Sequence, residues 1–282
     1  MRVLITGAAG LFGNGLTHVF VTEHIVFPVT HAVADTTNAS AIRDLFVKLE
    51  PEVVIHAAAI ADPDFCEDDP ALAFSVNVEG TRNVVEAARE IGAAVAFIST
   101  DSVFDGKKTT PYIETDGTNP STVYGRTKVQ GEEIVRTLPS HWIFRVPVLF
   151  GFGKIKFVEK GLIKLSKGEE FSTAVDQVAS TAYTLDAARK IMEVVDARLY
   201  GVFHVANAGS CSRYELAQHA AELAGLNPAL VIGKARSEMG NRAERLQYSV
   251  LEMRALKQHG IETPRPWEEA LEDYIREWQK KK

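Results

Sequence analysis

Residues 2–13 read RVLITGAAGLFG, a short β-branched run followed at once by three spaced glycines. The run predicts a buried strand and the residues after it predict a helix, so the glycines occupy the turn between the two. There Gly7 allows a tight turn, Gly10 lets the backbone approach a pyrophosphate, and Gly13 permits close helix–strand packing. The helix start would offer N–H groups and a positive dipole to phosphates. Glycines for turning and packing alone are the plain alternative, but in this position the pattern favours dinucleotide binding.

The next residues repeat the same alternation of strand and helix up to about residue 150. Pro28 lies inside the second predicted strand, which suggests a place near the sheet edge. Alternation of this kind predicts a doubly wound (Rossmann) α/β fold with a parallel sheet. The further strands are predicted at residues 25–29, 53–56, 94–98 and 142–146, and the helices at 11–21, 38–50, 69–90 and 121–136.

After residue 150 the pattern is less regular and predicts a smaller, mixed α/β C-terminal substrate domain. A capping box at residues 212–215 precedes one of its helices. We expect residues 1–150 with about 177–208 to form the NAD(P)-binding domain, and about 151–176 with 209–282 the substrate-binding domain. The predicted helices are 156–167, 181–195, 216–224 and one after Pro266, with a strand at 201–206.

Composition excludes several classes of function. The 282 residues carry 37 acidic and 31 basic side chains, a net charge of −6, with a basic block only at residues 280–282. Nucleic-acid binding is therefore not expected. No apolar run approaches the roughly 20 residues of a membrane span, and no signal peptide or metal-ligand spacing is evident. Two distant cysteines, Cys66 and Cys211, suit a reducing compartment, so we expect a cytoplasmic protein without metal or membrane partner.

The end of the second predicted strand bears on the choice of cofactor. Residues 30–32 are Thr, His and Ala, where an NAD-specific protein often has a carboxylate for the ribose 2′-hydroxyl. Asp35 lies further on, and could face the adenine side or cap the following segment. The absence of that carboxylate favours NADP over NAD by a small margin.

Tyr124 and Lys128 are four residues apart and share one face of a predicted helix. A nearby ammonium stabilises a phenolate, so we expect Lys128 to lower the pKa of Tyr124 and make the phenol usable in proton transfer. Thr100 lies at the carboxyl end of the predicted strand at 94–98, just after its last residue, and could hydrogen-bond the same substrate oxygen. A surface pair with aromatic packing is the alternative, but glycine loop, hydroxyl and Tyr/Lys pair together are more specific.

The chain resembles the extended short-chain dehydrogenase/reductases over nearly its whole length. Within that family it most resembles the dTDP-4-dehydrorhamnose reductases. The resemblance rests on the stretches STDSVFDG at 99–106, YGRTK at 124–128, PEVVIHAAA at 51–59 and NVEGT at 77–81. It implies an NAD(P)-dependent oxidoreductase that reduces a 4-keto-6-deoxy sugar nucleotide, with dTDP-4-dehydro-L-rhamnose as the first candidate.

Carried over residue by residue, the resemblance implies roles at the site. Tyr124 would protonate the C4 oxygen, Lys128 would tune it and hold the nicotinamide ribose, and Thr100 would polarise the carbonyl. Asn77 would be structural or part of a water relay, with no catalytic role assigned. The substrate-binding residues would be Asp101, Ser102, Val148 and Arg242. The cofactor-binding residues would be Gly7, Gly10, Leu11, Phe12, Gly13, Asp35, Ala57, Ala58, Ala59, Tyr124 and Lys128.

The chain also departs from the family pattern. Ser102 stands where the family usually has Tyr, and Val148 ends a stretch where it usually has Arg-Thr-Ser-Trp, which leaves the sugar and base open. One alternative is an NADP-binding regulatory subunit resembling the β subunit of methionine adenosyltransferase. Another is a sugar-nucleotide epimerase or dehydratase, although Ser102 replaces the carboxylate a dehydratase needs. The expected partner is a sugar nucleotide, and a homodimer is left open.

Overall fold

The structure, a computed structural model that describes residues 1–280, is built on a six-stranded parallel sheet in the order β10-β5-β4-β3-β1-β2. Lys281 and Lys282 of the terminal lysine run lie outside the described residues. Every neighbouring pair of strands is parallel, and β2 with Pro28 lies at one edge, as expected. The strands are β1 (Arg2–Thr6), β2 (Ile25–Val29), β3 (Val53–His56), β4 (Ala94–Thr100), β5 (His141–Val146) and β10 (Gly201–His204).

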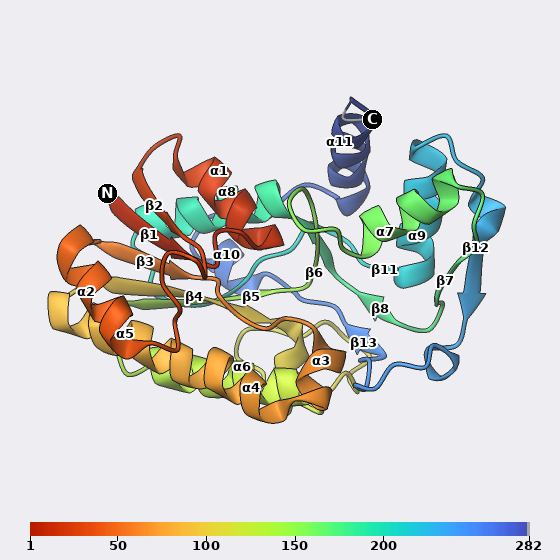
Figure 1. Ribbon diagram of the computed structural model, residues 1–282. Coiled ribbons are helices and arrows are strands. Elements are labelled where there is room, and N and C mark those ends of the chain that lie inside the picture. The colour runs from red at the N-terminus through yellow and green to blue at the C-terminus, as the bar shows by residue number, and fades with distance from the viewer. Residues whose placement is uncertain (281–282) are drawn as a thin grey trace.

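Helices cover both faces of this sheet, so the predicted doubly wound α/β fold is confirmed (Figure 1). Packing on two faces requires each strand to be apolar on both sides. In β1, Val3 and Ile5 belong to one core cluster and Leu4 to the other. One face carries α1 (Leu11–Phe20), α8 (Thr184–Asp196) and α10 (Arg254–Gln258), and the other carries α2 (Ala39–Leu49), α5 (Gly80–Ile91) and α6 (Val123–Val135).

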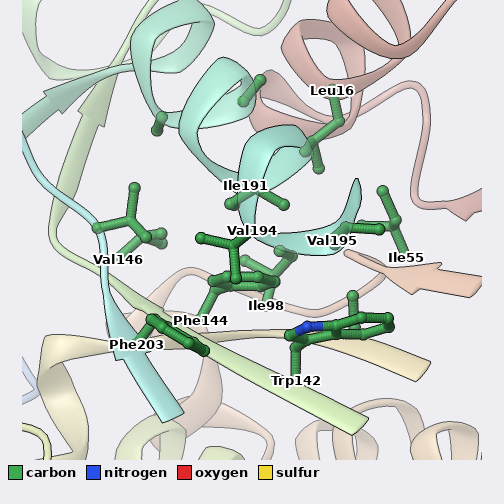
Figure 2. Packing of buried hydrophobic residues seen from close by; sticks show 14 of the residues in the cluster. Leu16, Ile55, Ile98, Trp142, Phe144, Val146, Ile191, Val194, Val195 and Phe203 are labelled. Carbon is green, nitrogen blue, oxygen red and sulfur yellow. The ribbon is translucent and has the colours of Figure 1, made fainter. Parts of the chain in front are cut away.

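The larger core cluster lies between the sheet and α1 and α8. Figure 2 shows Trp142 and Phe144 of β5 below Ile191 and Val194 of α8. Both aromatic rings are completely buried. Side chains of this size contribute roughly 1.5–3 kcal/mol each when fully buried, so the strand that follows α6 is held firmly in place.

A second group of shorter elements follows β5 and lies beside the sheet (Figure 1). They form three small sheets, β11-β8-β13, β12-β7 and β6-β9. The predicted capping box is present at the start of α9, where Ser212 and Glu215 bond each other's backbone. The strands are β6 (Val148–Phe150), β7 (Phe171–Ala174), β8 (Val178–Ala179), β9 (Thr181–Tyr183), β11 (Cys211–Ser212), β12 (Val231–Lys234) and β13 (Tyr248–Ser249), and the helices are α7 (Phe157–Ser166), α9 (Arg213–Leu223) and α11 (Trp267–Lys280).

Two predicted helices differ from the structure. The helix expected at 181–195 begins only at Thr184, because Thr181–Tyr183 pair with β6 as strand β9. The helix expected at 69–90 is interrupted: α4 (Pro70–Phe74) leads into a π-helical turn, Ser75–Glu79, before α5. The prediction also omitted α3 (Pro63–Asp68), which Asp62 caps.

The strand order places the ends of β1 and β3 at the point where the sheet's winding reverses. From β1 the chain moves outward to β2, and then returns to the other side of β1 as β3. Doubly wound sheets bind ligands at such a point, outside the carboxyl ends of the strands. Within residues 1–280, no helix is long and apolar enough to cross a membrane. The division into two domains stays a prediction.

Candidate active site

The glycine loop after β1 lies against the segment that follows β3. Gly7 has φ +68°, and a Cβ on it would lie 2.6 Å from the Ala58 nitrogen, so the two loops touch where glycine alone fits. Helix α1 then begins with Gly10 at its N-cap, with no capping side chain and no acidic residue in its first turn. The first N–H groups of the helix, at Leu11, Phe12 and Gly13, are therefore available to an anion. This arrangement fits the pyrophosphate of a dinucleotide.

The residues after β2 lie on the surface. The His31 imidazole is 86% exposed, and its Nε2 lies 3.2 Å from an Asp35 carboxylate oxygen. Asp35 also accepts a hydrogen bond from the Thr37 backbone N–H (2.9 Å), which lowers the pKa of Asp35. Asp35 thus closes a turn, while Asn38 caps α2.

At the carboxyl end of β4, the structure brings Thr100 and Tyr124 together. Burial raises the pKa of the Tyr124 phenol, and the nearby Thr100 hydroxyl acts against that rise. The negative charge of Asp101 also raises its pKa. The expectation that Lys128 lowers the pKa of Tyr124 is therefore wrong for this structure, because desolvation exceeds every lowering effect. The phenol is protonated at neutral pH.

Close packing of α6 on the turn after β4 brings Tyr124 next to Thr100. A Cβ on Gly125 would lie 2.2 Å from the Ser102 carbonyl oxygen, so glycine is required where the helix presses on the 3-10 turn Asp101–Val103. Thr122 caps the helix by accepting a hydrogen bond from Gly125 N–H (3.0 Å). With its first turn fixed, α6 presents Tyr124 to the end of β4.

Lys128 is buried on the same helix. Its Nζ lies 3.9 Å from the centroid of the Phe97 ring. Desolvation lowers the pKa of Lys128 to about 7, and the negative charge of Glu132, one turn further along α6, opposes this shift. The carboxylate of Glu132 is fixed by Arg145, at 2.9 and 2.8 Å, and by the Ser99 hydroxyl at 2.6 Å.

A buried histidine lies next to this lysine. His56, the last residue of β3, contacts Thr6 through Nδ1 (2.7 Å) and Thr81 through Nε2 (3.0 Å). The Thr81 hydroxyl donates to the Asn77 carbonyl at 2.7 Å, so it accepts from Nε2–H and leaves Nδ1 as an acceptor. Burial lowers the pKa of His56 to about 3, and Lys128 adds to the effect. The imidazole is neutral.

Asn77 links the loop after β3 to α6. Its Nδ2 donates to the Ile60 carbonyl and to the Thr127 hydroxyl, both at 3.0 Å. Its Oδ1 accepts from the Ile60 N–H at 2.8 Å. The π-helical turn that carries Asn77 widens α4–α5 at this point, so the side chain holds the loop beside the start of the Tyr/Lys helix.

Of the four predicted substrate residues, two adjoin Thr100. Asp101 is buried and accepts hydrogen bonds from the hydroxyls of Thr100 (3.0 Å), Ser102 (3.3 Å) and Ser249 (2.7 Å). Burial raises the pKa of Asp101, although these hydrogen bonds oppose the rise. Asp101 therefore connects the end of β4 to β13 in the smaller part of the chain.

The other two predicted substrate residues come from different segments, and Val148 follows by two residues Val146, which pairs with Thr100 in the large sheet. Val148 belongs to β6, and its carbonyl accepts a hydrogen bond from the Thr181 hydroxyl (2.9 Å). The Arg242 side chain is 71% exposed and pairs with Asp68. Arg245, which was not predicted, is more buried and pairs with Asp64 at 2.8 Å.

Sequence reasoning missed several polar residues around the site. Glu132 follows Lys128 by four residues, so helical spacing was a signal that could have identified it. His56, Ser249 and Arg213 gave no local signal, because their partners lie far away in the sequence. Within the part of the chain that the structure describes, no group of three or more His, Cys, Asp or Glu side chains could hold a metal ion.

Comparison with known proteins gives a consistent result. The family described as RmlD substrate binding domain matches residues 1–280. The spore coat polysaccharide biosynthesis protein SpsK of Bacillus subtilis is 35% identical, over 98% of this chain and 97% of that protein. A dTDP-4-dehydrorhamnose reductase of Streptomyces griseus is 35% identical, over 96% of this chain and 91% of that protein. The crystal structure of the dTDP-4-dehydrorhamnose reductase of Bacillus anthracis in complex with NADP is 33% identical, with a TM-score of 0.94 over 98% of this chain and 99% of that one.

Proposed function

This chain belongs to the family of the RmlD substrate binding domain, and from that membership we propose that it is an NAD(P)H-dependent oxidoreductase that reduces the keto group of a dTDP-sugar. Relatives of the family named dTDP-4-dehydrorhamnose reductase match it over nearly their whole length. The observation that carries the proposal is the meeting of Thr100 and Tyr124 at the carboxyl end of β4, close to the switch point of the sheet.

NADP(H) is the cofactor we propose, ahead of NAD(H). The relative from Bacillus anthracis was crystallised with NADP. In this chain, residues 30–32 carry no carboxylate, and Asp35 is engaged with Thr37 and His31. NADPH should therefore bind at least as tightly as NADH. A preference for NADH above about tenfold, roughly 1.4 kcal/mol, would contradict this choice.

The catalytic residues we propose are Thr100, Tyr124 and Lys128. The reduced nicotinamide, when bound, supplies the hydride. Tyr124 donates its proton to the carbonyl oxygen, a role that suits a phenol kept protonated by burial. The Thr100 hydroxyl, which donates to Asp101 in this structure, would turn to donate a hydrogen bond to the same oxygen and orient it. Lys128 lies on the same face of α6, where its ammonium can bind the cofactor's ribose.

For the substrate, we propose dTDP-4-dehydro-L-rhamnose, reduced to dTDP-L-rhamnose. Asp101 and Ser102 would contact the sugar, while Val148 and Arg242 would line the more distant part. Ser102 and Val148 are smaller than the aromatic residues usual in the family, so the space beside the sugar and base is where this enzyme would differ. The two cysteines are free and buried, which fits the reducing cytoplasm as the proposed location. A homodimer stays a prediction.

Turnover and its dependence on Tyr124 test the proposal. The protein should oxidise NADPH when it is offered dTDP-4-dehydro-L-rhamnose, and Tyr124→Phe should lower kcat about 10²- to 10⁴-fold, the usual contribution of a positioned acid. Cofactor affinity should not change. Thr100→Val should cost less. Equal turnover by Tyr124→Phe would refute the mechanism, and a parent that binds NADPH tightly without turnover would favour a regulatory subunit.

A further inference from the structure

Arg213 is the first residue of α9 and follows directly on β11. Its Nη1 is buried and has no hydrogen-bond partner among residues 1–280. The guanidinium carbon lies 4.9 Å from the centroid of the Phe157 ring, which supports one face of the group. The residue as a whole is partly exposed, but a buried donor of a charged group normally has a partner, because leaving it unpaired costs several kcal/mol. The described chain provides no partner for this donor of Arg213, so a bound ligand would have to supply one.

The charged groups around Arg213 do not supply the missing hydrogen-bond acceptor of its guanidinium. Asp101 attracts the guanidinium, while Arg245 repels it. No ion pair within 4.0 Å joins Arg213 to Asp101, whose carboxylate already accepts hydrogen bonds from three hydroxyls. Burial lowers the pKa of Arg213 to about 10, so the group stays cationic at neutral pH. A second anion is needed to complete its coordination.

The small sheet β11-β8-β13 places Arg213 opposite the catalytic end of β4. Cys211 of β11 and Ser249 of β13 both pair with Ala179 of β8, and Ser249 donates to Asp101 beside Thr100. Figure 1 shows this sheet between the large sheet and helices α7 and α9. Arg213 follows directly on this sheet, and its guanidinium interacts electrostatically with Asp101, the neighbour of Thr100.

We propose that Arg213 binds the diphosphate of the sugar nucleotide. This inference rests on the proposed function, because a sugar whose C4 keto group meets Thr100 and Tyr124 carries its diphosphate on C1, at the opposite end of the ring. A guanidinium offers two parallel N–H donors that match phosphate oxygens. In a desolvated position such a contact contributes strongly to affinity. Arg213 would then help to determine that the substrate carries an anionic diphosphate on C1.

The test compares ligands that differ only in phosphate. Calorimetry would measure the binding of dTDP and of thymidine to the parent, Arg213→Met, Arg213→Lys and Arg276→Met. Arg276 is an exposed arginine of α11 that pairs with Glu272 and Asp273, and it serves as the matched control. NADPH affinity, measured on the same samples, reports whether each variant keeps its fold. Methionine preserves the apolar stem that packs near Phe157.

Arg213→Met should weaken dTDP binding about 10- to 100-fold, the range expected for one charge-assisted contact. Thymidine and NADPH affinity should stay at parent values, Arg213→Lys should recover part of the loss, and Arg276→Met should match the parent. Equal dTDP affinity in parent and Arg213→Met would overturn the inference, as would a parent that does not bind dTDP. Reduction of the sugar without Arg213-dependent dTDP binding would refute this inference alone. Arg213-dependent dTDP binding without reduction would refute the proposed function alone.

Discussion

Tyr124 and Lys128 are neighbours on one face of α6, and burial changes both of their pKa values in the direction of the neutral form. The phenol keeps its proton more tightly, and the ammonium loses its proton more easily, with a pKa of about 7. At neutral pH the phenol of Tyr124 therefore holds its proton and can donate it, while Lys128 is divided between the ammonium and the amine. Glu132 limits the shift at Lys128, and Arg145 fixes Glu132 in turn.

Replacing Lys128 should change how stability depends on pH. The folded pKa of about 7 lies below the ordinary value of 10.5, so burial destabilises the folded state most below pH 7. Between these values the unfolded chain binds one more proton than the folded chain, so stability rises with pH, by at most about 1.4 kcal/mol per pH unit. Urea unfolding from pH 7 to 9 should show this rise in the parent, and less of it in Lys128→Met.

The exposed Lys167→Met is the control for that experiment, and its slope should equal that of the parent. Other titrating groups, including the buried tyrosines and cysteines, contribute equally to all three proteins and cancel in the difference. Identical slopes for parent and Lys128→Met would show that Lys128 remains protonated through this range.

Single residues also mark the limit of prediction from sequence. The glycine loop and the Tyr/Lys pair are local patterns, and both were identified. The pKa of Tyr124 was predicted in the wrong direction, because four-residue spacing reveals proximity but not desolvation. His56 and Arg213 could not be found, since what distinguishes each is a set of neighbours brought from other elements.

At the scale of elements, substitutions at two glycines of the turn between β1 and α1 should affect cofactor binding and fold stability differently. A Cβ on Gly13 would lie 2.1 Å from the Gly7 carbonyl oxygen, whereas one on Gly10 would lie 3.1 Å from it. Gly13→Ala should therefore destabilise the fold by at least the roughly 1–3 kcal/mol typical of overpacking. Gly10→Val should fold with a smaller loss of stability than Gly13→Ala, and should lose NADPH binding because its side chain occupies the approach to the helix start. Thermal unfolding and calorimetry measure the two effects, and unchanged NADPH affinity in Gly10→Val would exclude this loop as the cofactor site.

The ion pair between α6 and β5 makes a second prediction at this scale. Glu132 and Arg145 are 3% and 2% exposed, and two hydrogen bonds join them. Arg145→Met removes the buried cation and leaves the carboxylate only the more exposed Arg136 at 3.5 Å, which should cost about 3–5 kcal/mol in urea unfolding. The double variant Arg145→Met with Glu132→Leu should recover much of that loss, because neither member of the pair then leaves the other buried and unpaired. A double variant as unstable as the single one would show that packing, rather than charge, is responsible.

Elements with a strong repeating pattern were predicted, and those held by distant pairing were not. The strands of the large sheet were found because they are apolar on both faces. Strand β9 was read as the start of a helix, since Thr181–Tyr183 become a strand only when β6 lies beside them. The π-helical turn at Ser75–Glu79 likewise depends on Asn77 reaching Ile60 and Thr127, contacts that sequence spacing does not reveal.

Across the whole molecule, some of the polar contacts that connect the large sheet to the smaller elements lie at or near the site. Ser249 of β13 bonds Asp101, and Arg245 bonds Asp64 at the start of α3. A ligand that contacts Arg213 and Thr100 at once would add to these connections. The proposed substrate would thus stabilise the arrangement of both parts as well as bind between them.

Two buried histidines should make the whole molecule sensitive to mild acid. His56 ends β3 and His204 ends β10, both are completely buried, and burial lowers the pKa of each to about 3. Unfolded histidine titrates near 6.5, so below that pH the unfolded chain binds protons that the folded chain refuses, and stability falls as pH falls. Each histidine should therefore remove about 1.4 kcal/mol of stability between pH 7.5 and 5.5, before most carboxylates titrate.

Urea unfolding at pH 7.5 and 5.5 measures this loss. His204→Leu removes one titrating group from the strand β10, so its loss between the two pH values should be smaller than that of the parent by about 1.4 kcal/mol, whatever its absolute stability. His31→Gln, which replaces an exposed imidazole, should lose as much as the parent. If His204→Leu lost as much stability between pH 7.5 and 5.5 as the parent, His204 of the folded parent would take up its proton at nearly the same pH as histidine in the unfolded chain. The interior between β5, β10 and the loop at Glu114 would then be open to water, contrary to the burial of His204 in this structure.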